Sequence, residues 1–81
     1  MSVWLHKVSE TEESVVYRYG PTPDRMGVLE LDRETGDVYV REPVPEEQAE
    51  EFSLLGSLAL SRCWREGNFP ERVDAEQGFD L

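Results

Sequence analysis

The chain holds one histidine and one cysteine, the residue types that most often supply acid–base and nucleophilic chemistry. His6 alternates with Trp4 and Val8 along one predicted strand face. A general base must lie within hydrogen-bond reach of a nucleophile or a polarising group, and no pattern in the sequence supplies one. Cys63 falls on the apolar stripe of a predicted helix, a position typical of a small buried side chain. We therefore predict no catalytic residue and expect that the protein is not an enzyme.

Metal and phosphate sites are the next chemistry to consider. One histidine and one cysteine cannot complete a four-ligand zinc site within one chain. The acidic run from Glu30 to Asp37 resembles a calcium loop, but it lacks the closing glutamate at the required spacing. Its alternation instead indicates a solvent-facing strand that enters a turn. The glycines are scattered and form no phosphate-binding loop. We predict neither a metal nor a cofactor.

The charge of the chain excludes further classes of partner. Its 81 residues include 18 acidic and 8 basic side chains, which give a net charge of −10. Binding of a polyanion normally depends on basic groups, so we expect no nucleic acid partner. The most apolar window, 54–60, is too short to span a bilayer, and residues 1–7 lack the features of a signal peptide. A lone cysteine cannot form an intramolecular disulfide. We expect a cytoplasmic protein that does not bind membranes.

The first half of the chain alternates between apolar and polar residues, which is the pattern of β-strands. The predicted strands cover residues 2–8, 14–19, 27–32 and 38–41. Turn-forming residues separate them, including a proline pair between the second and third strands. Consecutive short strands with short turns predict an antiparallel meander.

The third and fourth strands form the clearest local pattern. A turn at residues 33–36, in which Gly36 can adopt a positive φ, sets Leu31 opposite Val38 and Leu29 opposite Val40. All four aliphatic residues then share one face, and a slip of one residue would turn them to water. On the other face the same register groups an acid, an aromatic ring and an arginine, which are Glu30, Tyr39 and Arg41.

The period changes to a helical one after residue 44. Pro45 suits the first helical position and Gly67 suits the residue after the end, so the predicted helix spans residues 45–66. Its apolar stripe consists of Ala49, Phe52, Leu55, Gly56, Ala59, Leu60 and Cys63. This stripe must pack on the sheet, which predicts an α+β fold with a four-stranded antiparallel meander and one long helix on one face. Residues 1–67 form this single β4α domain.

The remaining residues, 68–81, are predicted to form a C-terminal tail. Apolar residues in such a polar segment usually dock on the domain, and Phe79 and Leu81 are examples here. Leu54 and Leu58 point away from the core stripe and offer a docking place on the outer side of the helix. The tail is therefore predicted either to cover this pair or to be a loose end.

Two features of the predicted helix indicate a surface for a partner. Its acidic start matches the helix dipole and can also dock on a basic protein. Leu54 and Leu58 can cover a partner, form a two-fold dimer or lie under the tail. The candidate partner surface consists of Leu54, Leu58, Trp64, Glu46, Glu47, Glu50 and Glu51.

One resemblance follows from these elements. The hairpin sequence Leu-Glu-Leu-Asp-Arg-Glu-Thr-Gly-Asp-Val at 29–38, a single helix, and Glu-Gly-Asn-Phe-Pro-Glu at 66–71 resemble small uncharacterised bacterial proteins of sheet-plus-helix type. The resemblance covers most of the chain. Its motifs are turn and cap signals, so it implies a fold and no catalytic or binding residue.

Three functions remain open from the sequence. The leading hypothesis is a non-enzymatic, acidic, cytoplasmic module that binds a protein, in an immunity-like or inhibitor-like role against a basic partner. A second is a small ligand-binding protein or enzyme with a pocket between sheet and helix, lined by Trp4, His6, Tyr17 or Tyr19. A third is a structural homodimer built on Leu54 and Leu58. The sequence does not name the partner.

Overall fold

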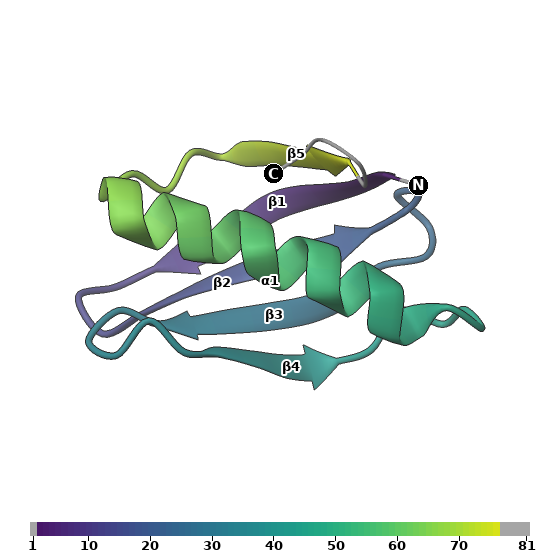
Figure 1. Ribbon diagram of the computed structural model, residues 1–81, viewed down its shortest axis with the longest axis horizontal. Helices are drawn as coiled ribbons and strands as arrows, with labels where there is room; N and C mark the ends of the chain where they lie inside the picture. Colours follow the sequence, from purple (N-terminus) through teal and green to yellow (C-terminus); the bar gives the residue numbers. More distant parts are fainter. Residues whose placement is uncertain (1, 77–81) are drawn as a thin grey trace.

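A computed structural model describes residues 2–76 and shows one helix packed on one face of an antiparallel sheet (Figure 1). The elements are β1 (Ser2–Glu10), β2 (Ser14–Gly20), β3 (Gly27–Asp32), β4 (Val38–Glu42), α1 (Ala49–Glu66) and β5 (Arg72–Glu76). The strand order is β4-β3-β2-β1-β5, and every neighbouring pair is antiparallel. The helix thus connects the two edge strands of the sheet, β4 and β5.

The fifth strand corrects the prediction of a four-stranded meander. Residues 72–76, which the sequence analysis assigns to the tail, pair with β1 in a register that sets Val73 opposite Leu5 and Ala75 opposite Val3. Without this strand, β1 would be a nine-residue edge with unpaired backbone groups. Residues 77–81, which include Phe79 and Leu81, lie outside the described part of the chain. Their docking on the helix stays a prediction.

The predicted hairpin register is confirmed. Leu31 pairs with Val38 and Leu29 with Val40. Both leucines are fully buried under the helix, whereas Val40 remains 46% exposed because β4 is an edge strand. On the other face, where the register was predicted to group Glu30, Tyr39 and Arg41, Arg41 Nε donates to Glu30 Oε1 at 2.6 Å.

The helix begins four residues later than predicted. Val44, between two prolines, is only 2% exposed and packs in the core. The chain must then cross from the sheet layer to the helix layer, and residues 45–48 form turns that make this crossing. The predicted end is confirmed, because Gly67 adopts a φ of 71° and donates to the carbonyl oxygen of Trp64 at 3.1 Å.

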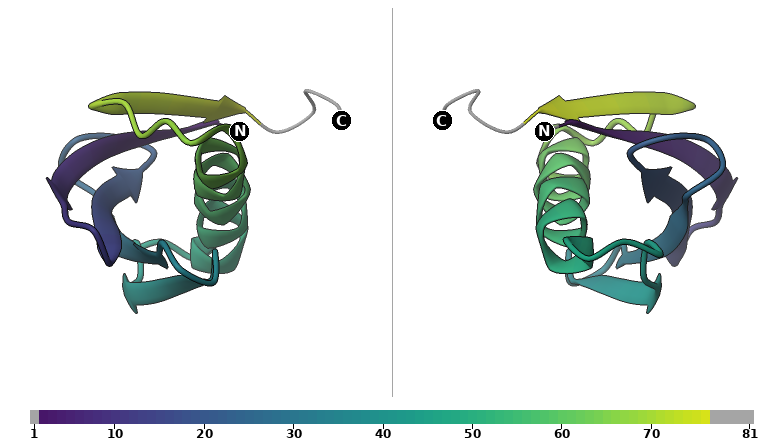
Figure 2. Two further views of the ribbon diagram at one scale, coloured as in Figure 1. Left: turned by 90° about the vertical axis from the view of Figure 1, so that its left-hand side faces the viewer. Right: turned by 90° about the vertical axis from the view of Figure 1, so that its right-hand side faces the viewer.

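The sheet curves around the helix, so its concave face and the helix enclose the core (Figure 2). The predicted apolar stripe of α1 faces the sheet: its buried residues are Phe52, Leu55, Gly56, Leu60 and Cys63. From the sheet, the fully buried side chains are Val3, Leu5, Val15, Tyr17, Tyr19, Leu29 and Leu31. Leu29 and Tyr19 lie directly against Gly56, where an added Cβ would approach Leu29 Cδ1 to 2.7 Å. Among residues 2–76, no helix lies on the opposite, convex face of the sheet.

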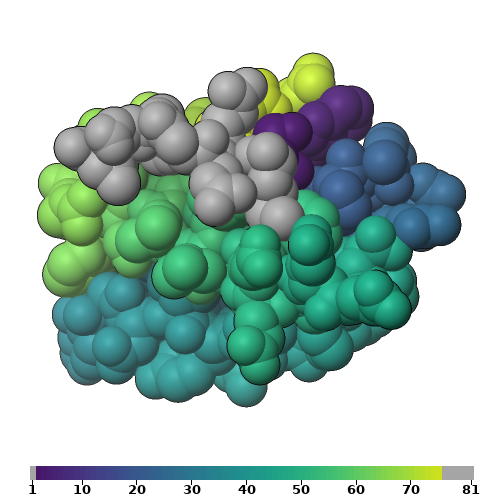
Figure 3. All heavy atoms as spheres, turned by 45° about the vertical axis from the view of Figure 1, so that its right-hand side comes forward, coloured from purple at the N-terminus to yellow at the C-terminus, as the bar shows by residue number. Residues whose placement is uncertain are grey.

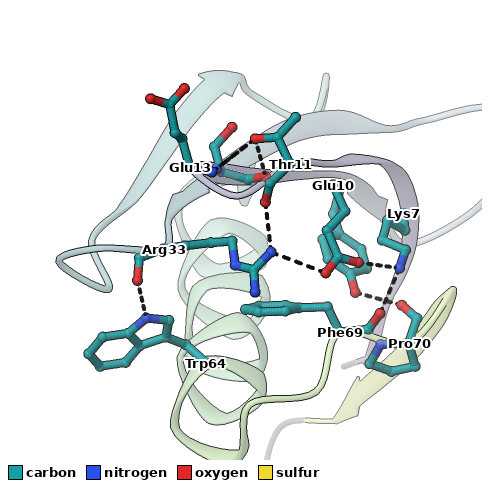
Figure 4. A network of polar contacts seen from close by, with 10 residues as sticks. Lys7, Glu10, Thr11, Glu13, Arg33, Trp64, Phe69 and Pro70 are labelled. Atoms are coloured by element: carbon teal, nitrogen blue, oxygen red, sulfur yellow. Dashed lines mark hydrogen bonds and ion pairs between the residues drawn. The ribbon is translucent and has the colours of Figure 1, made fainter.

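Polar contacts fix the segment that joins α1 to β5 (Figure 4). Lys7 Nζ donates to the Phe69 carbonyl oxygen at 2.8 Å and to Glu10 Oε1 at 2.7 Å. The Lys7 ammonium, through this hydrogen bond, holds the pKa of the Glu10 carboxyl below its usual value. The Arg33 guanidinium lies 5.5 Å from the centre of the Phe69 ring and donates to the Thr11 carbonyl oxygen at 2.6 Å. These contacts connect the C-terminal end of β1 and the β3–β4 turn to the chain that leads into β5.

Candidate functional site

The helix-free face of the sheet collects side chains that are not used in the core. Residues that alternate with the buried ones point to this face: Trp4, His6, Val16, Arg18, Val28, Glu30, Tyr39, Arg41, Arg72 and Asp74. They come from all five strands and include three arginines and two aromatic residues. The face is therefore built by the sheet as a whole and not by one loop.

Three basic residues form one row across neighbouring strands, which we call the basic row. His6 pairs with Arg72 on β5 and with Arg18 on β2. Directly opposite residues in an antiparallel sheet have Cα atoms about 4.5–5.5 Å apart, so two guanidinium groups flank one imidazole. Arg18 and Arg72 lie on the strands on either side of β1, about 10 Å apart across the sheet, so their like charges repel each other across His6. The basic row thus carries a local cost in a protein whose net charge is −10.

Trp4 lies at the edge of the basic row. The Arg72 guanidinium is 5.8 Å from the centre of the Trp4 ring, and the His6 ring centre is 6.0 Å away at an angle of 45°. A cation over an indole face is attracted by the ring quadrupole. This contact orients the Arg72 side chain along the sheet surface. It leaves the hydrogen-bond donors of the guanidinium available for an acceptor.

The two arginines of the row differ from most other basic residues in their pairing. Among the described side chains, no carboxylate lies within ion-pair distance of Arg18 or Arg72, although Asp74 is on the same face. By contrast, Lys7, Arg25, Arg33 and Arg41 each contact a glutamate. The basic row is therefore a place on this acidic protein where positive charge is not neutralised by a described neighbour.

A shallow hollow lies beside the row. Its volume is about 290 Å³, and its lining residues are His6, Lys7, Val8, Arg18, Pro23 and Met26. Val8 belongs to a β-bulge, because Lys7 pairs with Tyr17 while Ser9 pairs with Val16. The bulge leaves Val8 57% exposed. The hollow combines an apolar wall with the cationic groups of the row, which suits a ligand that has both an acidic group and an apolar part.

The repulsion within the basic row leads to a stability prediction. Replacing Arg18 by Glu sets an acid beside His6 and near Arg72, so a repulsive set becomes an attractive one. We expect Arg18→Glu to increase the free energy of unfolding by about 0.5 kcal/mol, measured by urea denaturation at pH 6. The matched change Arg65→Glu, at the end of α1, should decrease it because a helix C-terminus favours cations. A loss of stability in Arg18→Glu contradicts the repulsive row.

The acidic run that resembles a calcium loop has structural partners. Asp32 Oδ1 accepts hydrogen bonds from the backbone amides of Glu34 at 2.8 Å and Thr35 at 3.3 Å. Glu30 pairs with Arg41, as described above. These contacts stabilise the β3–β4 turn and the hairpin. Within residues 2–76 there is no group of three or more His, Cys, Asp or Glu side chains that could hold a metal ion.

His6 and Cys63 lie on opposite sides of the sheet. Cys63 is 7% exposed, packs between α1 and the sheet, and has a pKa raised by burial of its thiol. The structure also corrects the predicted pocket between sheet and helix. Tyr17 and Tyr19 are fully buried on the helix side, whereas Trp4 and His6 are on the other face. These four side chains therefore cannot line one pocket.

The predicted partner surface on the helix is only partly free. Trp64 Nε1 donates to the Arg33 carbonyl oxygen at 2.8 Å, and its ring covers Gly36 in the β3–β4 turn. Glu46 lies before the helix and pairs with Arg25 at 2.5 Å. Contacts within the chain thus engage two of the predicted residues. The exposed remainder consists of Leu54, Leu58, Glu47, Glu50 and Glu51.

Comparisons with protein-family models, curated proteins and solved structures found no match. Within residues 2–76 no helix is long and apolar enough to cross a membrane. Sequence reasoning missed the basic row, because it did not predict the strand that carries Arg72. The alternation of Arg72, Val73, Asp74 and Ala75 is the signal that could have found this strand.

Proposed function

We propose that the protein is a non-enzymatic binding module and that its helix-free sheet face binds an acidic segment of a partner protein. The observation that carries this proposal is the basic row, in which Arg18 and Arg72 flank His6 without a described carboxylate partner. An incoming carboxylate removes the repulsion between the two arginines. Relief of this repulsion therefore adds to the free energy of binding of the carboxylate.

The residue types on this face support a protein partner. Arginine, tryptophan, tyrosine and methionine are enriched at the energetic centres of protein interfaces. Trp4, Met26 and Tyr39 supply such side chains around the basic row and the neighbouring hairpin. An arginine side chain can bind a carboxylate through two parallel hydrogen bonds. The face thus combines charged contacts with apolar contacts of the kind that a peptide segment can fill.

The net charge sets a second condition on the partner. A protein with a charge of −10 attracts a basic protein before contact and repels an acidic one. The partner that fits both conditions is neutral or basic as a whole and presents a short acidic segment. An immunity-like or inhibitor-like role against a basic protein is one form of such a module.

A titration with short peptides tests the proposal. We expect hexaglutamate to shift the NMR signals of the Trp4 indole, His6 and the backbone amides of Arg18 and Arg72. Hexalysine at the same concentration should leave these four residues unchanged. The absence of shifts with hexaglutamate, or shifts centred on another surface, overturns the proposed site.

Two double variants separate the row from a general effect of charge. Arg18→Gln with Arg72→Gln removes two positive charges from the row, and we expect it to abolish the hexaglutamate shifts. Arg25→Gln with Arg65→Gln removes the same charge from other places and should retain them. Equal losses in both variants would mean that the peptide responds to net charge and not to this face.

A further inference from the structure

The outward side of α1 has a charge pattern that the proposed function does not involve. Atoms of the helix form a green band across the face of the molecule drawn in Figure 3. The exposed residues of the outward side change from acidic to apolar to basic along the chain: Glu47, Glu50, Glu51, Leu54, Leu58, Arg62 and Arg65. Leu54 is 61% exposed and Leu58 is 51% exposed. We call these seven residues the outward stripe.

The outward stripe is arranged symmetrically about one point. The midpoint between Leu54 and Leu58 falls at residue 56. Glu50 and Arg62 lie at equal distances on either side of it, about 9 Å along the helix axis at 1.5 Å per residue. Glu47, just before the helix, has Arg65 as its counterpart. An acid on one side of the midpoint is thus matched by an arginine on the other.

We propose that a second copy of this chain packs antiparallel against the outward stripe, about a two-fold axis at this midpoint. Such an axis sets Leu54 of each copy beside Leu58 of the other. It also brings Glu51 of each copy next to the helical turn that carries Arg62 in the other copy, because Glu51 lies five residues before the midpoint and Arg62 lies six residues after it. Every acid–base contact then occurs twice. The interface is self-complementary in both its apolar and its charged parts.

The antiparallel arrangement follows from the charges. A parallel pair of helices would set the acidic ends together and the arginines together. The two leucines at i and i+4 form the apolar centre that an interface between copies requires, and the stripe that faces the sheet is already filled. Small side chains at Ser57 and Ser61 flank the leucines, which permits a close approach of the two helices.

The expected dimer is weak. A single helix pair buries less than the roughly 800 Å² per partner that is typical of stable complexes, and both copies carry −10. Association should therefore become visible only at high protein concentration. The helix-free faces remain on the outside of such a dimer, so this inference does not depend on the proposed function. The hexaglutamate titration and the experiment below test separate surfaces.

Charge-swap variants test the dimer by sedimentation equilibrium over a range of protein concentrations up to about 1 mM. We expect the average mass to rise with concentration for the unmodified chain. Glu51→Arg should weaken association at least tenfold, because it sets like charges beside Arg62 of the second copy. Arg62→Glu should do the same. The double variant, Glu51→Arg with Arg62→Glu, restores opposite charges across the axis and should recover association to within about threefold of the unmodified chain.

The design excludes two simpler explanations. Glu51 and Arg62 are about 16 Å apart along the helix, so the double variant cannot be rescued by a contact within one chain. Glu51→Arg also lowers the net negative charge, and repulsion between whole molecules would therefore make this variant associate more strongly, not less. The control Glu12→Arg makes the same charge change in the β1–β2 turn and should not weaken the dimer. A mass that stays monomeric throughout, or a double variant without recovery, overturns the proposal.

Discussion

A chain that ends at Pro70 is expected to be strongly destabilised, with a much lower urea midpoint than the full chain. The deletion removes β5, exposes Val3 and Leu5 at a new sheet edge, and takes away the burial of Val73 and Ala75. Loss of this apolar burial and of the backbone pairing should cost on the order of 4 kcal/mol. A domain of this size has a total stability of roughly 4–12 kcal/mol, so the deletion removes about a third of it at the upper end of that range and all of it at the lower end. Circular dichroism during thermal and urea denaturation measures the effect.

A shorter deletion provides the control. A chain that ends at Glu76 retains all of the contacts described above, because it keeps β5 and its pairing with β1. We expect its urea midpoint to lie close to that of the full chain. A cooperative transition at an unchanged midpoint in the chain that ends at Pro70 would show that β5 contributes little to the domain.

The second large effect concerns Tyr17 and alkaline pH. Its side chain is fully buried on the helix side of β2, and its hydroxyl donates to the Pro70 carbonyl oxygen at 2.5 Å. Burial raises the pKa of Tyr17 well above its ordinary value of 10.0. The folded state therefore keeps a proton that the unfolded state releases above about pH 10. Stability is fully present below that pH and falls as the pH rises, by about 1.4 kcal/mol per pH unit.

The variant Tyr17→Phe isolates this contribution. Near pH 8 it should be less stable than the unmodified protein by about 1 kcal/mol, because the hydrogen bond to Pro70 is lost. Between pH 10 and 12 the unmodified protein loses roughly 3 kcal/mol through Tyr17, a loss from which the variant is free. The variant should therefore become the more stable of the two near pH 11–12. A difference between them that does not change from pH 8 to 12, in urea denaturation, contradicts this account of Tyr17.

Local patterns were sufficient for the elements whose partners are close in sequence. The turn at 33–36 sets the pairing of Leu31 with Val38, and both residues lie within the same hairpin. The apolar stripe of α1 repeats within each pair of turns, so its sheet-facing side was predicted correctly. In both cases the physical signal, a period of two or of 3.6 residues, is contained in a short segment.

The errors concern residues whose structure is decided by distant parts of the chain. Val73 and Ala75 occupy a strand because β1, at the other end of the sequence, needs a partner. Val44 delays the helix because it packs in the core, and no local propensity indicates this. The exposed leucines of the helix were predicted from periodicity. The basic row was not, because its members come from β1, β2 and β5 and meet only in the folded sheet.

The pairing of the first strand with the last also affects how the protein is made. Ser2 lies opposite Glu76, so β1 gains its second neighbour only after the chain has been synthesised to that point. Until then, β1 is an exposed sheet edge outside the ribosome, and it can pair with another nascent chain. Ribosomes add about 5–20 residues per second, and the remaining strands and the helix can assemble during this interval. The sheet is therefore completed only after residues 72–76 have left the ribosome, and the free edge of β1 is exposed until then.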